Sequence, residues 1–444
     1  MNGFERRVTA ASATRAERGH GGRVVAAVAV ACAATWIVLL APGFMSPDSA
    51  DQLRQARSGA FSDWHAPLGS LLWIATELVV TGPMGMLILQ SAILWTGLAL
   101  LSSRIAAPPA ARAAFLVALA LAPPIVSIAG AIWKDVLMAA LLTLAFGATD
   151  RRRAFWPVAF LATMSRHNAI PAVAVAVLLH VAPDRVTPRA LLRAAAASAL
   201  LLGASLAVNL AVADRRTNPA QVFLLGDFVG ISVTTQTVPT IDPCHQRLAQ
   251  SAPARAVAHD DDPKLKAALV GVATQFTYCT DQTASRTLLE RWLALVTEHP
   301  AAYLHVRSRL AGQLLGIDAT PGNFILTRSI FDPARFGLEP PRPTTAFQQW
   351  LGERLWSLRD SLLFRPWIYG VLGVVACVVG AARRRRWPCF IALSGLACEA
   401  TLFVVAPSAD YRYSYWMIVS ALIAALWLAI EALAGREQPP VRGD

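Results

Sequence analysis

Residues 24–42 read VVAAVAVACAATWIVLLAP, an apolar run without a charged side chain. About 20 apolar residues are enough for an α-helix to cross the hydrocarbon core of a bilayer. The run is long for the apolar part of a secretory signal peptide, and no clean small-residue cleavage site follows it. These residues therefore predict an uncleaved first membrane span.

Similar runs recur along the 444 residues, of which 55% are hydrophobic and 15% charged. An average soluble domain has about 25% charged residues. In lipid only helices and closed barrels satisfy the backbone, and these runs lack the alternation of barrel strands. We predict an all-α polytopic membrane protein with about ten transmembrane helices, at 24–42, 84–102, 113–129, 135–149, 154–165, 169–182, 190–212, 366–382, 387–406 and 413–434.

The breaks between these runs alternate in charge. Arginine clusters occupy the N-terminus, 104–112, 151–153, 185–193, 383–386 and 436–442. The positive-inside rule makes these breaks and both termini cytoplasmic. We therefore interpret the net charge of +12 as a topology signal rather than as a sign of nucleic-acid binding. The breaks 43–83, 130–134, 166–168, 213–365 and 407–412 then face outward, on the periplasmic side of a bacterial inner membrane.

Two assignments decide this topology. We count 154–182 as two short spans, and we interpret 67–81 as an amphipathic helix at the outer surface rather than an extra span. Changing either assignment alone would flip every later segment and place the arginines of 383–386 outside, against the charge rule.

Three parts follow from the spans. Residues 1–212 form an N-terminal transmembrane module, which carries spans one to seven and the first outer loop, 43–83. Residues 213–365 form a small, mostly helical extracytoplasmic domain with helical stretches at 263–280, 283–298 and 301–315. Residues 366–444 carry spans eight to ten. Cys244 and Cys279 lie in the outer segment, where an oxidising compartment allows them to form a disulfide.

Polar residues gather in the first outer loop. Asp48 and Asp51 are three residues apart, and on a helix they share one face. Asp63, Trp64 and His65 follow before the predicted interfacial helix. The alternative interpretation is structural, with an N-capped surface helix and a turn that has an aromatic anchor.

The later outer turns add cations. They contain Lys134 and Asp135, then Arg166, His167 and Asn168, and finally Tyr411, Arg412 and Tyr413. A lysine can instead snorkel, an aspartate can cap a helix, and tyrosines can anchor at the interface. Arginine on the outside runs against the charge rule, however, and its guanidinium suits bidentate binding of phosphate. All of these turns fall on the same predicted face.

Carboxylates and cations at an outer surface favour an anionic, lipid-linked sugar donor. The leaving group of a polyprenyl-phosphate sugar is already a phosphate, so it needs cationic stabilisation, whereas the acceptor hydroxyl needs a general base. The predicted catalytic residues are Asp48, Asp51, His65 and Asp135. The predicted phosphate-binding residues are Lys134, Arg166, His167 and Arg412, and the predicted substrate-binding residues are Asp63, Trp64, Asn168, Tyr411 and Tyr413.

The first outer loop also resembles a known family. Acidic residues followed by Asp63-Trp64-His65-Ala66-Pro67-Leu68 are similar to the first loop of GT-C membrane glycosyltransferases, especially the group of protein O-mannosyltransferases and the lipid A aminoarabinose transferase. That group has two adjacent prolines, of which Pro67 matches the second while Ala66 stands in place of the first. It also has an adjacent acidic pair, whereas Asp48 and Asp51 are separated. The resemblance implies an inverting transfer to a glycan, lipid or protein acceptor. It leaves open a divalent cation, Mg or Mn, for which Asp48 and Asp135 are the candidate ligands.

Other functions remain open at this point. An O-antigen ligase or polymerase would use a diphosphate-linked donor and residues of the large outer segment, such as His245, His259 or Arg307. A lipid-linked sugar transporter or flippase would carry ionisable residues at mid-membrane and repeat symmetry. A non-catalytic assembly factor that binds polyprenyl phosphate is a further alternative.

Overall fold

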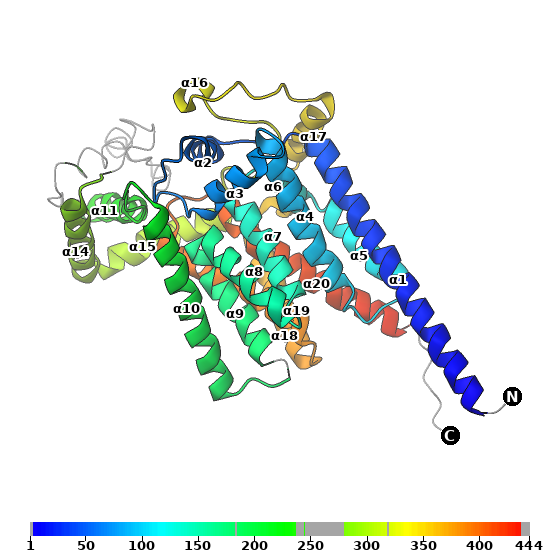
Figure 1. The fold of residues 1–444 in the computed structure, drawn as a ribbon. Helices are drawn as coiled ribbons and strands as arrows, with labels where there is room; N and C mark the ends of the chain where they lie inside the picture. The colour runs from blue at the N-terminus through cyan, green and yellow to red at the C-terminus, as the bar shows by residue number, and fades with distance from the viewer. Residues whose placement is uncertain (1–2, 183, 237–243, 245–278, 318, 437–444) are drawn as a thin grey trace.

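The computed structural model describes residues 3–182, 184–236, 244, 279–317 and 319–436. In these ranges the chain is helical, and β structure is limited to isolated bridges such as Phe44–Ala131. The fold class is therefore all-α, as predicted. Figure 1 shows the helices gathered in one tilted bundle, with both termini at one end.

Five helical segments in the described residues are long and apolar enough to cross a membrane. They are Gly21–Leu40 of α1 (Gly3–Leu40), α4 (Pro83–Ser102), α10 (Pro188–Val212), α19 (Arg386–Val405) and Tyr411–Gly435, which contains most of α20 (Tyr415–Arg436). A sixth forms if α5 (Pro109–Leu121) and α6 (Pro123–Ala129) are one span with a 59° bend. The bend follows from Pro123 and Pro124, because the residue before a proline is driven out of the helical region; Ala122 is extended.

The other predicted spans are shorter helices. They are α7 (Lys134–Gly147), α8 (Arg152–Ser165), α9 (Ile170–Val181) and α18 (Pro366–Ala382). α7 is buried along nearly its whole length and packs against α4, α8 and α20. Short helices are tolerated at membrane depth where protein surrounds them. Every predicted apolar range is therefore helical, with 113–129 divided between α5 and α6, and ten crossings remain a prediction.

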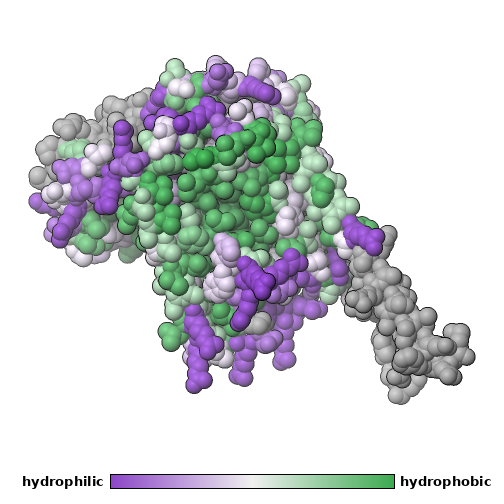
Figure 2. Space-filling view, viewed as in Figure 1, coloured by the Kyte–Doolittle hydropathy of each residue, from purple (hydrophilic) through white to green (hydrophobic). Residues whose placement is uncertain are grey.

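The surface is banded. On the face shown in Figure 2, hydrophobic residues cover the middle of the bundle, and hydrophilic residues lie at its two ends. This is the pattern of a helical membrane protein. The end away from the termini, called the α2 end below, carries α2 (Pro47–Ser58), α16 (Pro333–Phe336) and α17 (Ala346–Ser357). α3 (Leu68–Glu77) occupies the range predicted as an interfacial helix and packs against α2.

The described part of 213–365 is mostly helical, although the stretch 319–345 is irregular apart from α16. The helical part includes α11 (Gln221–Thr235), α14 (Gln282–Glu298) and α15 (Pro300–Leu314), and the last two match the predicted stretches 283–298 and 301–315. Nearly all of the predicted stretch 263–280 lies outside the described residues. Cys244 and Cys279 form the predicted disulfide.

A buried ion pair joins this segment to the bundle. Arg307 of α15 donates to a carboxylate oxygen of Asp227 in α11 at 2.7 Å, and to the carbonyl of Ala406 at the end of α19 at 2.8 Å. Both charged side chains are almost fully buried. Because breaking one partner of such a pair is costly, this contact fixes α11 and α15 against the end of α19.

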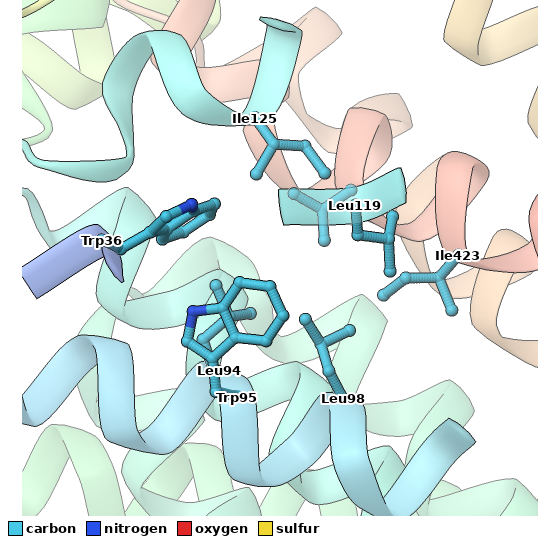
Figure 3. Close-up of a pocket in the computed structure, with 8 residues that line it drawn as sticks. Trp36, Leu94, Trp95, Leu98, Leu119, Ile125 and Ile423 are labelled. Atoms are coloured by element: carbon cyan, nitrogen blue, oxygen red, sulfur yellow. The ribbon is translucent and has the colours of Figure 1, made fainter. Parts of the chain in front are cut away.

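A small apolar cavity lies inside the bundle, where α1, α4, α5, α6 and α20 meet. The rings of Trp36 and Trp95 meet edge to face there, with centroids 5.1 Å apart (Figure 3). The other lining residues are aliphatic: Leu94, Leu98, Leu119, Ile125, Val419 and Ile423. An apolar cavity offers water no hydrogen-bond partners, so we assign it to packing and not to the polar site.

Candidate functional site

The start of α2 is fastened to the turn before α7. Ser46 precedes the helix, and Pro47 at the first helical position suits its fixed φ. The Ser46 hydroxyl accepts a hydrogen bond from the Trp133 indole at 2.7 Å, and Ser49 donates to the carbonyl of Ile132 at 2.6 Å. Asp48, in the first turn of α2, is thereby held next to Lys134.

The turn before α20 supplies the partner of Asp48. Arg412 donates to a carboxylate oxygen of Asp48 at 2.6 Å, although the two residues are 364 positions apart. The guanidinium also lies 5.0 Å from the centre of the Trp133 ring and 3.5 Å from Asp410. Both members of the pair are mostly buried, with side-chain exposures of 13% for Arg412 and 19% for Asp48. The predicted acid and cation of the first and last outer turns therefore meet.

A second ion pair lies beside the first. Arg166 donates to Asp135, whose side chain is fully buried. The Arg166 guanidinium lies 4.9 Å from the centre of the Tyr413 ring, and that of Arg412 lies 5.3 Å from the same ring. An aromatic face attracts a cation, so Tyr413 holds the two arginines next to each other.

His65 and Lys134 form the third contact. The Lys134 Nζ atom lies 3.2 Å from Nδ1 of His65, and Nε2 of His65 lies 3.7 Å from Asp51. Burial and the Lys134 charge lower the pKa of His65 to about 4. The imidazole is therefore neutral near pH 7, and its Nδ1 atom accepts a hydrogen bond from the Lys134 ammonium.

Burial and neighbouring charges also change the pKa values of Lys134 and Asp48. Burial and the Arg166 charge lower the pKa of Lys134, which precedes the predicted span 135–149, to about 7. Burial alone would raise the pKa of Asp48, but the charges of Arg412, His65 and Lys134 outweigh it and hold that pKa far below its usual range. The site thus contains a firmly ionised carboxylate beside a lysine that titrates near neutrality.

Several polar atoms of this cluster are buried without a hydrogen-bond partner among the described residues. They are Nε2 of His65, Oδ2 of Asp135, Nε2 of His167, Nδ2 of Asn168 and Nε of Arg412. Buried polar groups are normally satisfied, and a concentration of exceptions is typical of a functional site. Burial and the Lys134 charge lower the pKa of His167, so His167 lies near the cluster, and the roles predicted for His167 and Asn168 stay predictions.

Other predicted site residues hold structural contacts. Asp51 binds Arg54 at 2.5 Å and Gln55 at 2.6 Å on its own helix. Asp63 accepts hydrogen bonds from the backbone and hydroxyl of Thr217, at 2.5 and 2.6 Å. These contacts favour supporting roles over the predicted catalytic role of Asp51 and substrate-binding role of Asp63.

The prediction also assigns substrate binding to the aromatic residues Tyr411 and Trp64. Tyr411 is fully buried, and its hydroxyl donates to the carbonyl of Pro124 at 3.2 Å. That contact ties the turn before α20 to α6. Trp64 is half-buried between Asp63 and His65.

Sequence reasoning missed three contributors. The roles of Ser46 and Trp133 follow only from their contacts: the two are hydrogen-bonded to each other, and the Trp133 ring lies against Arg412. Asp410 accepts a hydrogen bond from Asn323 at 2.5 Å, which links the turn before α20 to the segment 213–365. The one available signal was the position of Trp133 and Asp410 beside residues already predicted.

The proposed metal ligands do not fit a cation. Asp48 and Asp135 are each bonded to an arginine, and a guanidinium competes with a divalent ion for the same oxygens. No group of three or more His, Cys, Asp or Glu side chains suited to a metal ion occurs within the described ranges. We therefore derive no step through Mg or Mn.

Comparisons with known proteins add no relative. A scan against protein-family models, a search of curated proteins and a search of solved structures each found no match.

Proposed function

We propose that this protein is an inverting glycosyltransferase that moves a sugar from a polyprenyl-phosphate donor to an acceptor at the outer face of a bacterial inner membrane. The observation that carries the proposal is the contact of Asp48 with Arg412, with Lys134 and Arg166 beside them. A carboxylate and several cations in one largely buried cluster match what an anionic sugar donor needs. The ten crossings and the outward orientation of the α2 end belong to the same proposal.

Arg412 and Lys134 are the candidate groups for the donor phosphate. The Lys134 ammonium has three N–H donors, of which one faces His65. Arg412 has a buried Nε without a partner among the described residues. A bound phosphate takes up these donors and competes with Asp48 for Arg412, which frees a carboxylate oxygen for the acceptor.

In the proposed reaction the acceptor oxygen attacks the anomeric carbon from the side opposite the phosphate. The new bond between oxygen and anomeric carbon forms as the bond from that carbon to the phosphate oxygen breaks. The acceptor proton passes to Asp48, and polyprenyl phosphate leaves with its charge held by the cations. A carboxylate of low pKa is a weak base, so this transfer comes late, when the attacking hydroxyl has become acidic.

Release of polyprenyl phosphate tests the proposal. Purified protein in lipid nanodiscs is given a panel of polyprenyl-phosphate sugars together with mixed acceptors, and free polyprenyl phosphate is measured. Asp48→Asn should reduce release by roughly 10²–10⁴-fold, the usual contribution of a general base. Full activity in Asp48→Asn would contradict the assignment of the base.

A matched control comes from the same outer loop. Glu77 is also bonded to an arginine, Arg57, at 2.8 Å, and it accepts a hydrogen bond from the backbone of Gly82. Glu77→Gln therefore removes a similar charge outside the cluster and should keep the activity. Diphosphate-linked donors in the panel test the ligase alternative, and sugar movement across the bilayer without release would indicate a flippase.

A further inference from the structure

The helix α17 exposes an aromatic stripe. Phe347 and Trp350 are 37% and 50% exposed, and Arg354 and Leu358 continue the same line at helical spacing. Residues three and four apart lie on one face of a helix. An exposed apolar patch of this kind usually marks an interaction surface.

The opposite side of α17 is fastened to the end of a candidate span. The side-chain amide of Gln348 donates to the carbonyl of Leu39 at 3.1 Å and to that of Ala41 at 2.7 Å. Leu39 is in the last turn of α1, whose carbonyls have no partner within the helix, and Ala41 directly follows the helix. Leu355 is buried on the same side. The helix α17 is therefore fixed at the depth where α1 ends (Figure 1).

A third face of α17 is polar over its first two turns. Gln349 and Glu353 are exposed and four residues apart, and Trp356, the next residue on this line, is 51% exposed and stacks on Phe324. α17 thus has a side toward the bundle, an aromatic side and a polar side. This is the arrangement of an amphipathic helix that lies along a membrane interface.

Further exposed apolar residues lie near the two ends of α17 that join the bundle. Val38, near the end of α1, is 73% exposed, and after α17 the chain passes through exposed Leu362 and Trp367 into α18. Trp and Tyr gather where a membrane meets water, because one part of the ring is apolar and another polar. Arg354, inside the stripe, has the long side chain that reaches from apolar surface to headgroups. These features favour lipid over a protein partner.

We propose that α17 lies in the plane of the membrane interface at the α2 end, with Phe347 and Trp350 in the boundary between headgroups and acyl chains. It anchors the segment 322–345, which crosses the α2 end through hydrogen bonds from Leu326 to Ser127 and from Ile330 to Met45. The inference depends on membrane insertion of the bundle and not on the proposed glycosyl transfer.

Site-directed spin labelling tests this position. The free cysteines Cys32, Cys377, Cys389 and Cys398 are replaced by alanine, and the disulfide is kept. Single cysteines are then introduced as Phe347→Cys and Trp350→Cys on the aromatic side, and as Gln349→Cys and Glu353→Cys on the polar side. All four side chains are exposed, so these changes remove little core packing. In nanodiscs, relaxation of each nitroxide is measured with oxygen, which enters lipid, and with a nickel chelate, which stays in water.

We expect labels at 347 and 350 to collide severalfold more with oxygen than with the chelate, and the ratio to reverse at 349. The label at 353 should give an intermediate ratio, because it lies three residues from 350, at the border of the two sides. The oxygen signal at 350 should match that of a headgroup-proximal lipid label. Equal chelate access at all four positions would overturn the proposal, because α17 would then lie in water. Signals at 347 and 350 that match a label near the bilayer centre would overturn it as well, because α17 would then lie below the interface.

Discussion

Lys134 is the group in the site whose charge changes near neutral pH. Its pKa is lowered to about 7 by burial and by Arg166, so the ammonium is charged below that pH and becomes neutral above it. An anionic ligand binds more tightly when the Lys134 ammonium is charged. Affinity for a phosphodiester should therefore fall as the pH rises above about 7, by at most about tenfold per pH unit.

Two choices make this pH dependence specific to Lys134. A polyprenyl-phosphate sugar is a diester, so its own charge stays constant over the measured range. Lys134→Arg keeps a cation at every pH, because arginine does not lose its proton in this range. Calorimetric titration at several pH values should give a falling affinity for the native chain and a flat one for Lys134→Arg. Parallel curves would show that another group causes the change.

The pair of Arg166 and Asp135 should dominate the stability of the site. Asp135 is fully buried and Arg166 is 14% exposed. Removing one partner leaves an uncompensated buried charge, at a cost of about 3–5 kcal/mol. Asp135→Asn and Arg166→Met should each lower the unfolding midpoint in detergent, and the double variant should be more stable than their summed effects suggest.

The pair of Arg57 and Glu77 is the control for this experiment. Its arginine is 41% exposed, and such pairs contribute about 0–1 kcal/mol. Arg57→Met should therefore hardly shift the midpoint. A drop as large as that of Arg166→Met would contradict the distinction between buried and exposed pairs.

The elements show what the sequence could predict. All ten apolar ranges form helices, because long apolar runs have few other solutions in lipid. The break between α5 and α6 was missed, although Pro123 and Pro124 signal it. The acidic and basic residues of the site could be identified from the sequence, but which of them form pairs could not. Asp48 and Arg412 are 364 positions apart, and no local pattern specifies which partners meet.

The hydrogen bonds between the predicted first outer loop and the residues that follow α10 lead to a prediction about these two segments. Asp63 accepts from Thr217 and from the backbone of Asn218, and its own backbone N–H donates to the carbonyl of Arg215. Asp63→Ala removes the side-chain bonds. Amide hydrogen exchange should become faster both at 61–66 and at 214–218, because the hydrogen bonds of Asp63 hold these two segments together.

A second aspartate with a purely local role serves as the control. Asp281 caps α14 by accepting from the backbone of Thr283 and Ala284. Asp281→Ala should speed exchange only in the first turn of α14. If Asp63→Ala also acted only on its own loop, the link would not couple the two segments.

For the whole molecule, the charge rule assigns the α2 end to the outside. Glu339, in the segment 322–345, and Arg152, at the start of α8, are both exposed, and the predicted topology places them on opposite sides. Single cysteines at these two positions can be probed with a membrane-impermeant maleimide in right-side-out vesicles. Glu339→Cys should react at once, and Arg152→Cys only after the membrane is opened.

The same experiment in inside-out vesicles should give the reverse order, which controls for differences in thiol reactivity. If Arg152→Cys reacted first in right-side-out vesicles, the cluster of Asp48, Lys134 and Arg412 would face the cytoplasm. A lipid-linked donor displayed on the outer leaflet could not then reach it, and the proposed reaction would fail, whereas the fold would stand. Orientation is therefore the property of the whole molecule on which the proposed chemistry depends.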